Sequence, residues 1–186
     1  MKITTSKQEI KDLFKAWIAI SIAFGIVLYY REGYLAFLIA AIAVGFGFLF
    51  HELGHKIVAQ HYHLYAEFRS FDQMLILAIL MAYFLKIVFA APGAVMIRGT
   101  HYLDNKKNGK ISLAGPLVNL ILAFIFLILL SFKIFPTISG WGLFINALIA
   151  LFNMIPIGNF DGAKVLRWNK PIYFIVVFIS FVLITL

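Results

Sequence analysis

Long apolar runs separated by short polar stretches dominate this chain of 186 residues. The runs cover residues 16–30, 34–50, 74–85 with a continuation to about 97, 111–132, 141–157 and 171–186. A helix that crosses a bilayer needs roughly 20 predominantly apolar residues, with about 17 as the lower limit. The pattern therefore predicts a bundle of membrane-spanning helices.

Two of these runs decide how the chain is threaded. Run 34–50 continues without a helix breaker as far as Ala59. Run 74–85 has only twelve residues before Lys86, and Pro92 followed by Gly93 then interrupts any helix. Segment 74–97 can therefore either cross the membrane or return to the side from which it came.

The first polar stretch has the pattern of a short amphipathic helix over residues 6–17. Ser6 and Glu9 have the spacing of a capping box at its start. Its apolar side carries Ile10, Leu13, Phe14 and Trp17. We expect this helix to lie on the membrane surface.

Composition supports an integral membrane protein. Hydrophobic residues make up 63% of the chain and charged residues only 13%, whereas a soluble domain is about 45–50% apolar. The net charge of +8 would suggest nucleic acid in a soluble protein, but here the basic residues lie between apolar runs, so no nucleic-acid partner is expected. The chain has no cysteine, so any metal must be held by histidine and carboxylate side chains.

Lysine and arginine are enriched on the cytoplasmic side of membrane proteins, and this rule separates the two topologies. With the N-terminus inside and segment 74–97 crossing, seven basic residues lie inside and eight outside. If the segment instead enters and returns, 13 lie inside and only Arg31 and Lys133 lie outside. We therefore expect the re-entrant topology in the cell membrane, with a cavity beside residues 74–100.

The expected fold is an all-α polytopic membrane protein, a bundle of five to six transmembrane helices with a short re-entrant or β-hairpin element. We expect one membrane-embedded domain over residues 1–186. Residues 1–15 form a cytoplasmic or interfacial amphipathic segment, and residues 62–110 form a re-entrant and cytoplasmic region.

Three ionisable residues within five positions interrupt the second apolar segment: His51, Glu52 and His55. Such residues are costly inside a membrane and usually mark function. Residues four apart on a helix lie roughly 40° apart around its axis, so both imidazoles project from one face. This is the HExxH arrangement of two zinc ligands and a general base, and a divalent cation would also offset the charge of Glu52.

A catalytic zinc site usually has three protein ligands and an open position for water. The candidates for the third ligand are Glu67, Asp72, Asp104, Asp161, His61, His63 and His101. In the re-entrant topology, segment 141–157 ends at Pro156 on the same membrane side as His55, which favours Asp161. The three other histidines are expected to be surface residues.

Three motifs together resemble the signature of the site-2 proteases, a family of intramembrane zinc metalloproteases. They are His51-Glu52-Leu53-Gly54-His55, Gly115-Pro116-Leu117-Val118-Asn119, and Asn153-x-x-Pro156-x-x-x-x-Asp161-Gly162. They fall on three separate spans within residues 45–162, and this joint spacing is far more specific than HExxH alone.

The resemblance implies that His51, His55 and Asp161 bind one Zn2+ and that Glu52 is the catalytic base. It also implies that Asn153 lies in the active site, where it orients the substrate or stabilises the oxyanion. The implied activity is hydrolysis of transmembrane protein substrates within the lipid bilayer, at a site open to the cytoplasm. Phe160 in place of leucine and the missing second proline in 157–159 depart from the family pattern, and the PDZ and CBS domains of many relatives are not expected.

Substrate binding can be assigned to the re-entrant region. A helical substrate must unwind before cleavage, and an extended chain gains by pairing with the edge of a strand. Residues 88–97 have the pattern strand, turn, strand, and we expect Ala94, Val95, Met96 and Ile97 to offer this edge. The alternative is that these residues only pack.

Two other functions remain open. Some membrane zinc transporters carry the same histidine spacing, but the outer halves of the spans have almost no ligating residues. A catalytically silent relative that binds membrane proteins is the second alternative, and the intact His51, Glu52, His55 and Asp161 argue against it.

Overall fold

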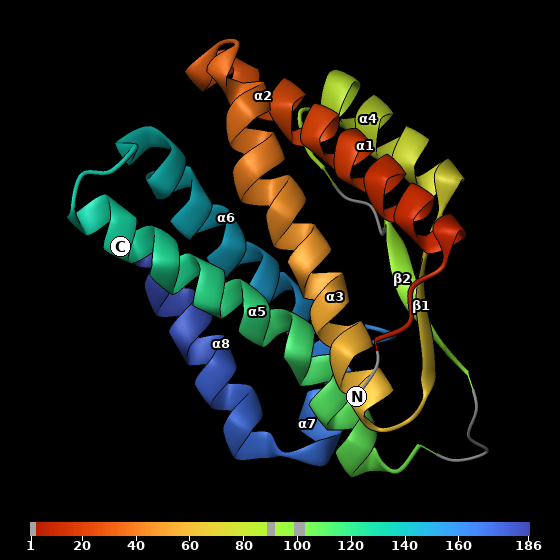
Figure 1. The fold of residues 1–186 in the computed structure, drawn as a ribbon. Coiled ribbons are helices and arrows are strands. Elements are labelled where there is room, and N and C mark those ends of the chain that lie inside the picture. The colour runs from red at the N-terminus through yellow and green to blue at the C-terminus, as the bar shows by residue number, and fades with distance from the viewer. Residues whose placement is uncertain (1–2, 89–91, 99–102) are drawn as a thin grey trace.

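Helices account for most of the chain in the computed structural model, which describes residues 3–88, 92–98 and 103–186 (Figure 1). In chain order the elements are α1 (Lys7–Glu32), α2 (Leu35–Ile39), the π-helix η1 (Ala40–Gly45), α3 (Phe46–His61), β1 (Tyr65–Ser70), α4 (Asp72–Leu85), β2 (Gly93–Arg98), α5 (Asn105–Ser131), α6 (Pro136–Asn153), α7 (Asp161–Trp168) and α8 (Lys170–Thr185).

Four helices of the described chain are long and apolar enough to cross a membrane. They are Lys7–Glu32, Leu35–His61, Asn105–Ser131 and Pro136–Asn153. These helices indicate a membrane protein, as the sequence predicts. The expected five to six spans are not confirmed, because α4 and α8 are apolar but have only 14 and 16 residues.

The N-terminal helix differs from the prediction. The expected short surface helix over residues 6–17 and the apolar run 16–30 form one continuous helix, α1, of 26 residues. Ser6 caps it, and its side chain accepts a hydrogen bond from the backbone N–H of Glu9. The acidic side of its first turns is buried against the protein, while Ile10 and Phe14 are 58% and 59% exposed. A helix that faces lipid turns its apolar side outward, which reverses the usual amphipathic arrangement.

The two strands form an antiparallel hairpin in which Ser70 pairs with Gly93 and Tyr65 pairs with Arg98. The sequence predicts that the strand over 93–97 follows another strand just before the turn at Pro92. This prediction is wrong for the described residues, because β2 pairs with β1 instead. Residues 89–91 of that prediction lie outside the described residues. Since Ser70 pairs with Gly93, the chain between them leaves and returns at one end of the hairpin, as a re-entrant segment would.

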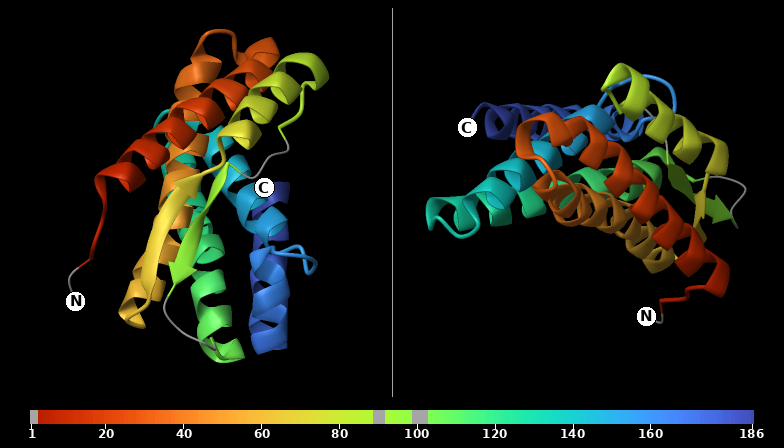
Figure 2. Two further views of the ribbon diagram at one scale, coloured as in Figure 1. Left: turned by 90° about the vertical axis from the view of Figure 1, so that its right-hand side faces the viewer. Right: turned by 90° about the horizontal axis from the view of Figure 1, so that it is seen from above.

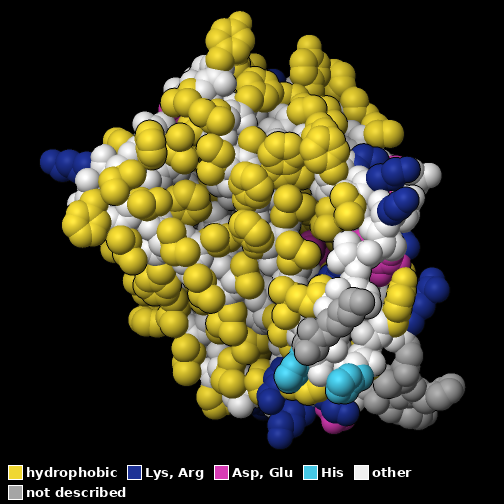
Figure 3. Space-filling view, in the orientation of Figure 1, with side chains coloured by type: hydrophobic (Ala, Val, Ile, Leu, Met, Phe, Trp, Pro, Cys, Tyr) yellow, Lys and Arg dark blue, Asp and Glu magenta, His cyan; other side chains and the backbone are white. Residues whose placement is uncertain are grey.

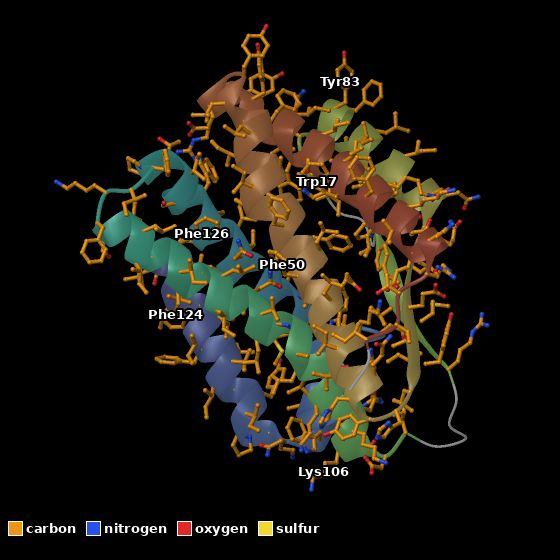
Figure 4. The ribbon with its side chains drawn as sticks, viewed as in Figure 1. Trp17, Phe50, Tyr83, Lys106, Phe124 and Phe126 are labelled. Carbon is orange, nitrogen blue, oxygen red and sulfur yellow. The ribbon has the colours of Figure 1, made fainter. Side chains whose placement is uncertain are left out.

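Two groups of helices flank α3. On one side α4 runs along α1 beside the hairpin, and on the other α5, α6 and α8 pack together (Figures 1 and 2). Hydrophobic side chains cover most of the face seen in Figure 3, while lysine and arginine gather near the hairpin and around the start of α5. Lys106 marks that end, and Phe124 lies on the apolar length of α5 (Figure 4).

The second membrane-length helix contains a π-helical segment, η1, just before α3. A π-helix shifts backbone hydrogen bonds from i→i+4 to i→i+5 and often occurs near functional sites. Two of its carbonyls accept hydrogen bonds from side chains of other helices. The Trp17 indole donates to Ala41 O at 3.1 Å, and the Asn146 amide donates to Ala43 O at 3.0 Å. The segment is therefore fixed from both sides by α1 and α6.

Candidate metal centre

The two histidines of the HExxH motif point toward the same position from α3. The Nε2 atoms of His51 and His55 lie 3.0 Å apart, and both residues are buried. Each Nδ1 atom is held by an oxygen: His51 Nδ1 lies 2.6 Å from Asn119 Oδ1, and His55 Nδ1 lies 2.7 Å from Ile111 O. Because amide and carbonyl oxygens only accept hydrogen bonds, both rings carry their proton on Nδ1 and turn Nε2 toward a common ligand.

Asp161 completes this group from the first turn of α7. Its Oδ2 atom lies 3.1 Å from His55 Nε2 and 3.5 Å from His51 Nε2. Gly162 lets α7 begin directly against the end of α6, because a Cβ atom there would lie 2.1 Å from Met154 O. Lys164 Nζ, 3.8 Å from Asp161 Oδ1, adds a positive charge on the other side of the carboxylate.

The motif Gly115-Pro116-Leu117-Val118-Asn119 explains how α5 comes so close to the imidazoles. A Cβ atom on Gly115 would lie 2.4 Å from His55 Nε2 and 2.5 Å from His51 Nε2. Any side chain at this position would therefore occupy the space in front of both ligand atoms. Gly115 and Asn119, one turn apart on α5, thus serve the same site.

This group fits a zinc ion. The ligand atoms of His51, His55 and Asp161 all lie within 4.8 Å of one another. Two imidazole nitrogens and one carboxylate oxygen are a donor set of catalytic zinc sites, where three protein ligands leave a fourth position open. His51 and His55 each have an outer hydrogen bond of the kind that fixes a metal ligand.

Glu52 lies one residue from His51 and is buried as well. The backbone N–H of Val95 lies close to its carboxylate. This contact brings β2 next to the metal group, so the predicted strand edge and the predicted base are neighbours.

The two outer edges of the hairpin differ. On β1, the N–H of Phe68 donates to Glu9 Oε1 at 3.0 Å, and the carbonyl of Ala66 accepts from Gln60 Nε2 at 3.1 Å. Both groups therefore point away from β2, and in this register their partners Val95 and Ile97 point their backbone groups away from β1. The outer edge of β1 is covered by side chains, whereas the outer edge of β2 faces Glu52.

The remaining ligand candidates have other contacts. Glu67 accepts hydrogen bonds from Ser6 and Tyr65, which lower the pKa of its carboxyl below the ordinary value. Asp72 pairs with Lys15, and Asp104 caps α5 by accepting from the backbone N–H of Lys107. The described histidines His61 and His63 are exposed, and His101 lies outside the described residues.

Asn153 is the last residue of α6. Its side chain donates to Ile149 O at 2.9 Å within its own helix, so the described hydrogen bonds do not link it to the metal group. Its active-site role stays a prediction. The sequence does not single out Asn146, which is fully buried and accepts a hydrogen bond from Asn119. Its polar side chain inside apolar run 141–157 is the signal that could have identified it.

A membrane protein with a metal group of two buried histidines and the partly buried Asp161 is the class that the fold and site define. The chain is 46% identical, over 92% of its length and 90% of the relative's, to a protein of Methanocaldococcus jannaschii named "Putative zinc metalloprotease". No protein-family model matches the chain, and no solved structure matches it. The chain belongs to the family of that zinc metalloprotease, so zinc is its metal cofactor, and His51, His55 and Asp161 form a group that can hold a metal ion.

Proposed function

We propose that this chain is an intramembrane zinc metalloprotease of the site-2 type. It hydrolyses peptide bonds in or near the transmembrane segments of membrane-protein substrates and acts in regulated intramembrane proteolysis. The observation that carries the proposal is the metal group: its two buried histidines lie on the long apolar helix Leu35–His61, beside the outer edge of β2. The zinc metalloprotease relative supports the chemistry.

Glu52 is the proposed general base. Zinc, when bound, polarises a peptide carbonyl and lowers the pKa of water toward about 7. Glu52 takes the proton of the attacking water and passes it to the leaving amine. Burial of Glu52 beside His51 keeps this proton transfer away from bulk solvent, and Asn153 would orient the substrate or stabilise the oxyanion.

The outer edge of β2, from Ala94 to Ile97, is the proposed substrate site. An unwound substrate segment would add as a strand to the outward backbone groups of Val95 and Ile97. The closeness of Val95 to Glu52 favours this edge, because a strand paired there passes beside the base.

The proposed orientation places the N-terminus and the active-site opening on the cytoplasmic side of the cell membrane. The distribution of basic residues supports it, since 13 of the 16 lysines and arginines lie inside in the re-entrant topology. The chain between β1 and β2 leaves and returns at one end of the hairpin, which is compatible with that topology.

The experiment uses the full chain purified in detergent with zinc and a panel of single-span membrane proteins as substrates. We expect the wild type to cleave at least one of them. Glu52→Gln should retain zinc without cleaving, because its amide cannot accept the proton. His51→Ala should lose or weaken zinc binding, and His61→Ala is the matched control, since this histidine is exposed on the same helix.

Each outcome separates the proposal from its alternatives. Cleavage by Glu52→Gln at the wild-type rate would refute the mechanism. Zinc flux into proteoliposomes without cleavage would instead support a transporter. Zinc binding with neither activity would support a catalytically silent membrane-protein-binding relative.

A further inference from the structure

Two asparagines form a buried chain behind His51, on the side away from the ligand atoms. Asn119 Oδ1 lies 2.6 Å from His51 Nδ1, and Asn119 Nδ2 donates to Asn146 Oδ1 at 3.0 Å. Both asparagines are fully buried. We propose that Asn146, on α6, is a positioning residue of the metal centre, which acts on His51 through Asn119.

The direction of every hydrogen bond in this chain is set by backbone carbonyls at its far end. Asn146 Nδ2 donates to Ala43 O at 3.0 Å and to Gly142 O at 2.9 Å. Carbonyls cannot donate, so the amide oxygen of Asn146 must face the other way, toward Asn119. Its amide group is therefore held in one orientation.

Asn119 is oriented in turn by the oxygen of Asn146. Its Nδ2 group donates both to Asn146 Oδ1 and to Gly47 O, the latter at 3.1 Å. This leaves its oxygen for His51, which must then carry a proton on Nδ1 and a lone pair on Nε2. The tautomer that can bind a metal is thus specified by Asn146 on α6, through Asn119 on α5.

Removing the side chain of Asn146 would release this restraint. Asn119 would lose the Asn146 acceptor and keep Gly47 O, so the rotated amide, with Nδ2 facing His51 Nδ1, would be less strongly disfavoured. That orientation favours the tautomer with a proton on Nε2, which cannot bind a cation. Outer hydrogen-bond partners of metal ligands typically change metal affinity by about 10–100-fold.

The proposal predicts a specific pattern of coupling. Asn119→Ala should weaken zinc binding by about 10–100-fold and Asn146→Ala by about 10-fold. If Asn146 acts through Asn119, the double variant should bind zinc no more weakly than Asn119→Ala alone. Two independent effects would multiply instead.

Zinc affinity is measured by competition with a chromophoric chelator on the full chain in detergent, with helical content checked by circular dichroism. The matched control is Ser139→Ala, which removes a buried polar group of α6 whose hydroxyl donates to Ile134 O. We expect this control to bind zinc as the wild type does. Wild-type affinity in Asn146→Ala, or multiplied losses in the double variant, would overturn the proposal.

A second measurement needs no variant. The nitrogen chemical shifts of histidine distinguish its tautomers, and in the zinc-free wild type His51 should carry its proton on Nδ1. A proton on Nε2 would refute the proposal that Asn146 and Asn119 fix the tautomer of His51, even if Asn146→Ala fails to fold. The inference rests on the metal site of the proposed function, but zinc affinity does not require proteolysis, so a protein that binds zinc without cleaving refutes only the proposed function.

Discussion

Lys56 and Glu9 form an ion pair in the interior, one residue beyond His55. Lys56 Nζ lies 2.6 Å from Glu9 Oε2, and the two residues are only 1% and 0% exposed. Lys56 also donates to Thr5 Oγ1 at 2.9 Å, and the other oxygen of Glu9 accepts the N–H of Phe68. The pair joins the start of α1 to the metal-binding helix and to β1.

Replacing one partner should be far more damaging than replacing both. Lys56→Met leaves the Glu9 carboxylate buried without a counterion, and such losses cost about 3–5 kcal/mol. The double variant Glu9→Met and Lys56→Met removes both charges and leaves chiefly the Phe68 N–H without its acceptor. An unpaired buried group of this kind costs about 1–3 kcal/mol. We therefore expect the double variant to be more stable than Lys56→Met alone.

The free energy of unfolding can be measured by reversible SDS titration of the full chain in mixed micelles, followed by circular dichroism. Asp72→Asn is the matched control, because its ion pair with Lys15 lies at the surface, with the two side chains 64% and 45% exposed. We expect little change in that variant. The reasoning would be refuted if Lys56→Met unfolded within about 1 kcal/mol of the wild type, or if the double variant were the less stable of the two.

Three further predictions follow from the site and its supports. Gly115→Ala should abolish or greatly weaken zinc binding, measured by chelator competition, because its Cβ would lie 2.4 Å and 2.5 Å from the two ligand nitrogens. Zinc at 100 times its Kd should stabilise the wild type by about 2.7 kcal/mol in thermal unfolding, and equal stabilisation of Asp161→Ala would contradict its role as a ligand. The lowered pKa of Glu67, due first to the hydrogen bond from Ser6 and then to that from Tyr65, makes a stabilising contribution that is present above the ordinary pKa of about 4.3 and is lost as the pH falls below it. Glu67→Gln should therefore flatten the dependence of stability on pH in this acidic range, and an unchanged pH profile would count against these hydrogen bonds.

Two of the three members of the metal group were directly predictable from sequence, because they lie close together on one helix. The four-residue spacing of His51 and His55 puts both on one helix face, and the structure brings Asp161 to them from the end of another helix. The residues that hold this group in place are harder to predict from sequence. Gly115 belongs to one of the three motifs, but its role depends on how closely α5 approaches α3. A hydrophobic pattern does not predict the distance between two helices.

The two incorrect predictions, for the partner of β2 and for the start of α1, also have physical causes. The partner of β2 was misassigned because strand pairing is non-local, and the true partner β1 lies on the other side of α4. The first turns of α1 were expected to form a separate helix, since their polar positions break the apolar run. Glu9 instead faces the protein, where Lys56 and the backbone of β1 satisfy it, so polarity near a membrane does not by itself indicate exposure to water.

The unequal edges of the hairpin restrict how copies of this protein can associate. A bare strand edge is a template for pairing with any other extended chain and is a common origin of aggregation. Here the edge of β1 is occupied by Glu9 and Gln60, so two molecules cannot join their hairpins into a growing sheet through that side. Whatever strand adds to the hairpin must add at β2, where the neighbouring side chain is Glu52.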